Sequence, residues 1–226
     1  MVRAIVCDIE GTTTSLSFVH QVLFPISLQQ MDRFIHDNWE SNLIREELLA
    51  LDKPSPEEAS ALLKSWIQTD KKAPVLKSIQ GKIWKQSFES GEIRGHVYPD
   101  VPVCFKKWKD AGIRTCIFSS GSIEAQTLIF RYSQAGDLTI YIDSYFDTTT
   151  GPKRDRASYR KIASAVDLSP REIPFLSDVT QELDAARMAG MQTMHVLREG
   201  AVQETQTPHS TATSLEEVRI QFTTSS

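Results

Sequence analysis

The sequence predicts an α/β protein in which a doubly wound parallel sheet carries an inserted helical domain. The short apolar run at 4–7 and strand-like segments such as 113–118 alternate with helical stretches at the start and in the second half of the 226-residue chain. Runs of this kind are typical of strands buried on both faces of a parallel sheet. Their alternation with helices indicates a sheet covered by helices on both sides. From residue 17 to about 90, apolar residues instead recur at helical spacing.

The helical stretch follows the first strand directly and contains roughly four expected helices. Ser55 before Pro56, with Glu57 and Glu58 behind them, is a typical helix start: a capping hydroxyl, a proline in the first turn, and acids near the positive helix end. We therefore expect a core made of residues 1–16 and 96–226, with a helical cap formed by residues 17–95.

The second half of the chain supplies the remaining elements of the core. We expect strands over 113–118, 173–177 and 192–197, short extended pieces between 138 and 146, and helices over 103–109, 123–132, 157–166 and 182–189. Residues 203–214 are rich in threonine, serine and glutamine, so we expect a loose surface segment there.

Composition narrows the class of protein. The chain is 40% hydrophobic and 24% charged, which argues against disorder, and its net charge of −4 without a long basic run disfavours nucleic-acid binding. Three widely spaced cysteines indicate thiols in a reducing compartment. No apolar stretch is long enough to cross a membrane, so we expect a cytoplasmic protein without membrane contact.

Polar side chains follow three of the expected strands. They are Asp8 and Glu10 after the first, Ser119 and Ser120 after the second, and Asp178 after the third, with Lys153 in a loop between the last two. Ligands of open α/β sheets bind beyond the carboxyl ends of the strands, so we expect these groups to share one site. Two acids at a strand end need a cation or a proton, which suggests Mg²⁺.

Phosphoryl transfer needs this set of groups. Asp8 could attack phosphorus and form an aspartyl-phosphate. Mg²⁺ between Asp8 and Asp178 would relieve their repulsion. Ser120, with the amides that begin the next helix, and Lys153 would hold the phosphate oxygens. Glu10 could protonate the leaving oxygen and then deprotonate the hydrolytic water.

Each residue also has a simpler interpretation. Residues 119–122 could form only a helix cap, and Asp178 could cap the helix behind it. Lys153 could be one of several solvated charges. Glu182 could sit on an exposed helix turn or support the metal indirectly. The joint occurrence at successive strand ends favours the site.

Together these segments resemble the four ordered motifs of the haloacid dehalogenase-like hydrolases, which have a Rossmann-like core. The closer resemblance is to the enolase-phosphatase family of the methionine salvage pathway. It rests on DIEGTTT (8–14), VLFP (22–25), LKSIQGKIW (76–84), GHVYPDV (95–101), SSGS (119–122), GDLT (136–139), YFDT (145–148), GPKR (151–154) and LSDVTQELDAARMAG (176–190).

The resemblance implies a monomeric enzyme with one Mg²⁺ per chain and a small phosphorylated substrate. In that family, 2,3-diketo-5-methylthiopentyl-1-phosphate is enolised and then dephosphorylated to the acireductone 1,2-dihydroxy-3-keto-5-methylthiopentene. By motif position, Asp8 carries over as nucleophile and metal ligand.

The other roles carry over in the same way. Glu10 and Asp178 fall at metal-site positions, and Glu10 could ligate through its backbone carbonyl. Ser119, Ser120 and Lys153 fall at substrate-binding positions. Two alternatives stay open: a related phosphatase for another small phosphoester, and a relative that holds a metal or phosphate without turnover.

Overall fold

The computed structural model describes residues 1–53, 55–69, 71, 73–198 and 208–218. The chain divides into two compact units, Met1–Leu16 with Gly95–Ser226, and Ser17–Arg94. Each unit has a hydrophobic core of its own.

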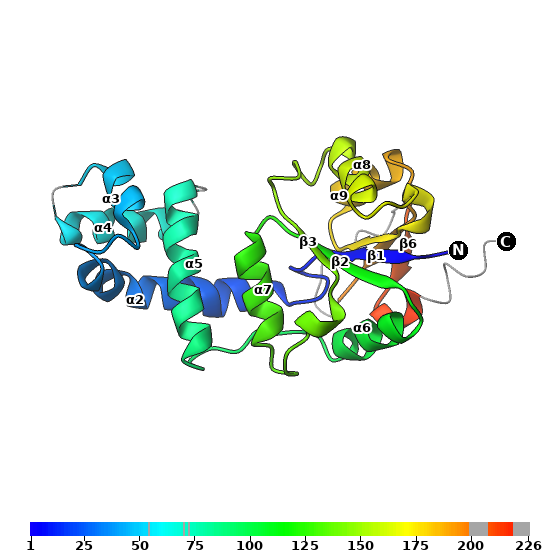
Figure 1. The fold of residues 1–226 in the computed structure, drawn as a ribbon, viewed down its shortest axis with the longest axis horizontal. Coiled ribbons are helices and arrows are strands. Elements are labelled where there is room, and N and C mark those ends of the chain that lie inside the picture. Colours follow the sequence, from blue (N-terminus) through cyan, green and yellow to red (C-terminus); the bar gives the residue numbers. More distant parts are fainter. Residues whose placement is uncertain (54, 70, 72, 199–207, 219–226) are drawn as a thin grey trace. The chain divides into compact units, whose positions relative to one another are not determined.

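The first unit is built on a parallel sheet (Figure 1). Within the described residues its strands are β1 (Ala4–Cys7), β2 (Arg114–Phe118), β3 (Ser144–Phe146), β4 (Phe175–Ser177), β5 (Thr193–Val196) and β6 (Ser210–Ala212). They run in the order β3-β2-β1-β4-β5-β6, and every neighbouring pair is parallel. The predicted α/β class with a parallel sheet is therefore confirmed. Because β1 lies between β2 and β4, the segments that follow these three strands meet at one edge.

Helices cover both faces of this sheet. They are α6 (Asp100–Asp110), α7 (Ile123–Arg131), α8 (Arg156–Ala165) and α9 (Thr180–Met188), with 3₁₀ turns at Thr139–Tyr141, Pro170–Glu172 and Leu215–Glu217. Helices α8 and α9 lie on one face and α6 lies on the other (Figure 1). Tyr159 of α8 is fully buried, and its ring centroid lies 5.6 Å from that of Phe118 and 5.0 Å from that of Phe175. These contacts fasten α8, and the loop before it, over β2 and β4.

The second unit is helical. Its elements are α1 (Leu16–Phe18), a π-helical turn (Val19–Leu23), α2 (Phe24–Asp37), α3 (Arg45–Leu51), α4 (Pro56–Gln68) and α5 (Pro74–Glu89). The N–H of Glu58 donates to the Ser55 hydroxyl at 3.3 Å, so Ser55 caps α4 as expected. The Trp84 indole of α5 donates to the carbonyl of Leu23, 2.9 Å away, and so fastens α5 to the wide π turn.

The structure corrects the expectation for residues 203–214. Residues 203–207 lie outside the described part of the chain. Residues 210–212 form β6, and the Leu197 N–H donates to the Ala212 carbonyl at 2.8 Å. Ala212 and Leu215 are buried, so backbone pairing and two apolar anchors order a segment whose composition is typical of loops.

Smaller differences concern where elements begin. Helix α6 starts at Asp100 rather than at 103, and α9 starts at Thr180 rather than at 182. The stretch from 138 to 146 holds one 3₁₀ turn and the three-residue strand β3. None of the helices in the described residues combines the length and apolarity that crossing a membrane requires.

Candidate active site

Asp8 follows β1 immediately and is buried, with 4% of its surface exposed. Its backbone N–H donates to the Leu176 carbonyl of β4 at 2.9 Å, which continues the sheet pairing one residue past β1. Its Oδ1 accepts the N–H of Ile9 at 2.7 Å. The carboxylate is therefore fixed at the carboxyl edge of the sheet, against the end of β4.

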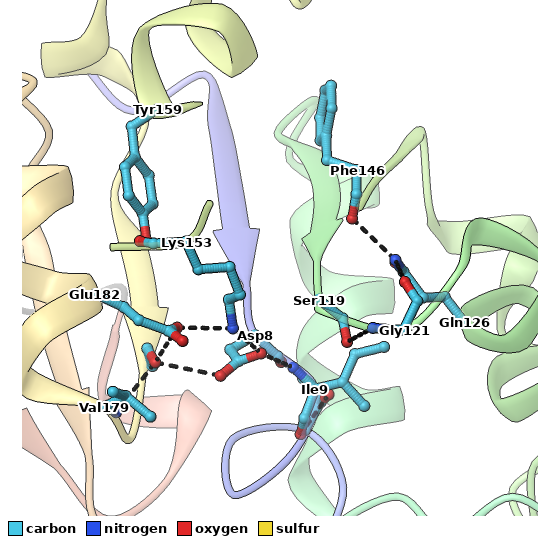
Figure 2. A network of polar contacts seen from close by, with 12 residues as sticks. Asp8, Ile9, Ser119, Gly121, Gln126, Phe146, Lys153, Tyr159, Val179 and Glu182 are labelled. Atoms are coloured by element: carbon cyan, nitrogen blue, oxygen red, sulfur yellow. Dashed lines mark hydrogen bonds and ion pairs between the residues drawn. The ribbon is translucent and has the colours of Figure 1, made fainter. Parts of the chain in front are cut away.

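Lys153 reaches this carboxylate from the loop before α8 (Figure 2). Its Nζ lies 2.6 Å from Asp8 Oδ1 and 2.7 Å from Glu182 Oε2. All three side chains are close to fully buried. Burial works against the charge on Lys153, but the two carboxylates outweigh it and raise the pKa of the ammonium group.

The backbone around Lys153 is fastened to α8. The Tyr159 hydroxyl donates to the Lys153 carbonyl at 2.6 Å, and the Ser158 hydroxyl donates to the Pro152 carbonyl at 2.7 Å. Since Tyr159 is locked in the core, it fixes the loop from which the ammonium group extends. The interpretation of Lys153 as a solvated surface charge is therefore wrong.

Asp178 approaches the turn after β1 from the end of β4. A Cβ built on Gly11 would lie 2.0 Å from Asp178 Oδ2, so the carboxylate occupies space that only glycine leaves open. Burial and the nearby charge of Asp8 raise the pKa of Asp178 to about 7. Its Oδ1 is buried without a hydrogen-bond partner in the structure.

These features fit a divalent cation. The site contains three carboxylates, those of Asp8, Asp178 and Glu182, and one ammonium group, that of Lys153. When all of them are ionised, the net charge of the site is −2. An unpartnered buried carboxylate oxygen is a ligand suited to Mg²⁺. The described residues contain no group of three or more His, Cys, Asp or Glu side chains arranged to hold a metal. Asp178 supplies the unpartnered carboxylate oxygen, and the charge of Asp8 lies near enough to raise the pKa of Asp178.

Glu10 lies two residues beyond Asp8 on the turn, and its side chain is exposed. The N–H groups of residues 12, 13 and 14 all donate to the Ile9 carbonyl, at 3.2, 2.9 and 2.8 Å. This tight turn separates the surroundings of the two acids: Asp8 is enclosed, whereas Glu10 meets solvent.

Ser119 and Ser120 follow β2, next to Asp8's strand in the sheet. Ser119 is buried and its hydroxyl accepts the Gly121 N–H at 3.1 Å (Figure 2). Ser120 is exposed. Ser122, not Ser119, caps α7 by accepting the Ala125 N–H at 3.2 Å. The interpretation of this segment as a helix cap thus applies to Ser122, and the Ser119 hydroxyl is not the cap of α7.

Comparison with known proteins decides the family. The sequence matches the haloacid dehalogenase-like hydrolase family over residues 2–190. The chain belongs to the haloacid dehalogenase-like hydrolases. Curated relatives named enolase-phosphatase E1 include one from Alcanivorax borkumensis, 46% identical over 92% of this chain and 95% of its own, and one from Pseudomonas aeruginosa, 47% identical over 88% and 91%.

A solved structure agrees with this haloacid dehalogenase-like assignment. The UTR4 protein of Saccharomyces cerevisiae superposes with a TM-score of 0.85 and is 32% identical, covering 96% of this chain and 99% of its own. The likeness thus extends over the helical insert as well as the sheet.

One polar residue of this hydrolase was not among the predicted site residues. The Ser177 hydroxyl lies 3.3 Å from Asp8 Oδ2 and 3.2 Å from Glu182 Oε2, and it accepts the Val179 N–H at 3.1 Å. Glu182, for its part, touches Lys153 and Ser177. A serine ending a buried apolar strand beside Asp178 is the sequence signal that could have identified it.

Proposed function

We propose that this chain is an enolase-phosphatase of methionine salvage. It would convert 2,3-diketo-5-methylthiopentyl-1-phosphate to the acireductone 1,2-dihydroxy-3-keto-5-methylthiopentene and phosphate. Identity of 41–47% with proteins named enolase-phosphatase E1, over most of the chain, supports this activity. The observation that carries the chemistry is the buried Asp8 carboxylate, held at the sheet edge beside a lysine.

In the phosphatase step, Asp8 is the nucleophile. An Asp8 oxygen bonds to phosphorus while the bond from phosphorus to the substrate oxygen breaks, and Glu10 gives that oxygen a proton. Glu10 then takes a proton from the water that cleaves the aspartyl-phosphate, which restores Asp8 and releases phosphate. The different surroundings of the two acids suit these roles, since Asp8 is enclosed and Glu10 can exchange protons with solvent.

Charge on the substrate needs groups that offset it. Lys153 would turn part of its hydrogen bonding from Asp8 and Glu182 to the phosphoryl oxygens, with Ser119 and Ser120 binding the same group. Glu182 would keep Lys153 and Ser177 in place, and through them support the metal site.

Mg²⁺ would be held by Asp8, by Asp178 and by the backbone carbonyl of Glu10. When bound, it supplies positive charge that offsets the negative oxygens of both the enolate and the phosphoryl group.

The helical unit would act as a cap that excludes water and bulky phosphoesters. We further propose a monomer located in the cytoplasm.

The first test is phosphate release from the diketo phosphate, with Mg²⁺ and with EDTA, recorded together with the ultraviolet absorbance of the enol product. We expect release and enol absorbance only with Mg²⁺, and a loss of release of at least about 1,000-fold in Asp8→Asn. Asp167→Asn is the matched control, because Asp167 is exposed and its φ of 53° is one that asparagine also adopts.

Other outcomes are equally informative. Release from simple phosphoesters but not from the diketo phosphate would mean that the chain is a phosphatase with a different substrate. Absence of release from any phosphoester would favour a protein that binds a metal or phosphate without turnover. For the enolisation step, we propose Glu10 as the base that removes the carbon-bound proton. In Glu10→Gln, we then expect slower uptake of solvent deuterium into the diketone, and uptake at the wild-type rate would exclude Glu10 from that role.

A further inference from the structure

Arg198 lies two residues beyond β5, at the same edge of the sheet as Asp8, and only 8% of its surface is exposed. Its Nε and Nη2 donate to the carbonyl of Thr12, at 2.9 and 2.7 Å. Its Nη1 donates to Asp100 Oδ2 at 2.8 Å. The guanidinium carbon lies 4.2 Å from the ring centroid of Tyr98. The buried charge is thus held by the carbonyls of Thr12 and Thr213, by a carboxylate and by an aromatic face.

Asp100 holds Arg198 from a rigid position. It is the first residue of α6, and its Oδ2 also accepts the Ser214 hydroxyl at 3.0 Å and the Leu215 N–H at 2.6 Å. Helix α6 and the segment after β6 therefore fix the carboxylate from two sides.

The loop that Arg198 contacts carries the proposed chemistry. Residues 9–14 follow Asp8 directly and include Glu10 and Gly11, the glycine that makes room for Asp178. Inside the loop, the N–H groups of residues 12, 13 and 14 converge on the Ile9 carbonyl, and the Thr13 hydroxyl donates to the Asp8 carbonyl at 3.0 Å. The Thr12 carbonyl is bound from outside the loop, by Arg198.

We infer that Arg198, oriented by Asp100, is a positioning residue that fixes the loop of residues 9–14 relative to Asp8 and Asp178. The effect on turnover rests on the proposed function, whereas the effect on the loop does not. Two donors on one carbonyl and a third on a carboxylate require the planar fork of arginine, and the single ammonium of lysine cannot supply them. Arg198 touches neither Lys153 nor the serines after β2 in these contacts, so phosphate binding should not depend on it.

The test compares Arg198→Lys with Arg187→Lys in the full-length enzyme. Arg187 is the matched control, because it pairs with Asp184 on the surface, with about half of its side chain exposed. Amide hydrogen exchange without substrate measures how often the loop of residues 9–14 opens, and steady-state kinetics on the diketo phosphate measure turnover. In Arg198→Lys we expect exchange at residues 11–14 to quicken about 10-fold or more while β1 and β2 stay protected.

In Arg198→Lys, we expect kcat to change and KM to stay nearly constant. We expect kcat to fall about 10-fold or more, since small displacements of reacting groups slow catalysis strongly. KM and the inhibition constant of inorganic phosphate should stay within about 2-fold, because the residues proposed to bind phosphate are untouched. Arg187→Lys should match the wild type in every measurement.

Three results would overturn the inference: wild-type exchange at residues 11–14, exchange that quickens equally across the whole sheet, or an unchanged kcat. If Arg198→Lys does not fold, Asp100→Asn replaces it, and wild-type exchange in its loop overturns the inference as well. A wild-type enzyme that releases no phosphate would refute the proposed function, while loop exchange would still decide the role of Arg198.

Discussion

Gly11 is the residue at which the turn after β1 comes closest to Asp178. Its φ is +73°, and a Cβ there would lie 2.0 Å from the Asp178 carboxylate. We expect Gly11→Ala to push Asp178 aside and to lower kcat about 100-fold, because catalysis is sensitive to displacements of this size. Phosphate-release kinetics measured over a range of Mg²⁺ concentrations will show the change.

Gly112 provides the control for that substitution. Its φ of +71° is nearly the same, but a Cβ built on it meets nothing within 4 Å. Gly112→Ala should therefore lower the free energy of unfolding by about 1 kcal/mol, the strain of a left-handed alanine, and leave kcat unchanged. If Gly11→Ala also left kcat unchanged, glycine would be needed at position 11 only for its positive φ, and not for the close approach of Asp178.

Two buried threonines give opposite predictions for one substitution. The Thr115 hydroxyl on β2 has no hydrogen-bond partner in the structure, whereas the Thr193 hydroxyl on β5 is hydrogen-bonded to His209 Nδ1 at 2.7 Å. We expect Thr115→Val to raise the free energy of unfolding by about 1 kcal/mol and Thr193→Val to lower it by about 1–3 kcal/mol. Urea unfolding measures both, and a loss of stability in Thr115→Val would contradict the assignment.

At the residue scale, the sequence was informative where a general rule of sheets applies. Asp8 and Asp178 end neighbouring strands, and their proximity follows from the carboxyl edge that β1 and β4 share. The partners of Lys153 could not be predicted in this way. Its contact with Glu182 depends on how the loop before α8 lies against α9, and no local pattern encodes that.

At the scale of elements, α6 carries one acidic residue at each end, and they should contribute very differently. Asp100, at the start, is buried against Arg198, whereas Asp110, at the end, pairs with Lys106 in solvent. We expect Asp100→Asn to lower the free energy of unfolding by about 3 kcal/mol at pH 7, because it breaks a buried ion pair. Asp110→Asn should change it by less than about 0.5 kcal/mol.

The contribution of Asp100 should also depend on pH. Burial raises the pKa of Asp100, but the hydrogen bond from Arg198 and those from residues 214 and 215 outweigh it, so its pKa lies below the ordinary value. A depressed carboxyl pKa stabilises the fold above the unfolded-state value, about pH 4, and this stabilisation disappears as the pH falls through the folded-state value. The difference between wild type and Asp100→Asn in urea unfolding should therefore narrow below about pH 4; a constant difference would exclude ionisation as its source.

The helices and strands differed in how well they could be predicted from the sequence. Strand β1 is a continuous apolar run, β2 ends in the apolar residues 116–118, and the helices of the insert show clear apolar periodicity, so these elements were predictable. β6 was missed because it has three residues and only Ala212 is buried. Such an edge strand is determined by pairing with β5, a contact distant in sequence that a scan of composition does not register.

At the scale of the whole molecule, the insert enters and leaves the sheet unit at two neighbouring points. The Ser15 N–H donates to His96 Nδ1 at 3.1 Å, the Thr14 hydroxyl donates to the His96 carbonyl at 2.7 Å, and the Tyr98 N–H donates to the Thr13 carbonyl at 3.1 Å. All these contacts lie within the unit that holds Asp8. A short connection from residue 16 to residue 95 could therefore replace the whole helical unit.

We expect a chain in which a short Gly/Ser linker replaces residues 17–94 to fold, because each unit has its own hydrophobic core. Trp108 is then the tryptophan that remains, and its burial makes its fluorescence a report on the sheet unit alone. Urea unfolding followed at Trp108 should stay cooperative. Turnover of the diketo phosphate should fall about 100-fold, since the proposed cap no longer positions the substrate or excludes water. Full turnover by the shortened chain would mean that the sheet unit alone recognises the substrate. A chain that fails to unfold cooperatively would instead mean that the sheet unit needs the insert to fold, and that the two cores are not independent.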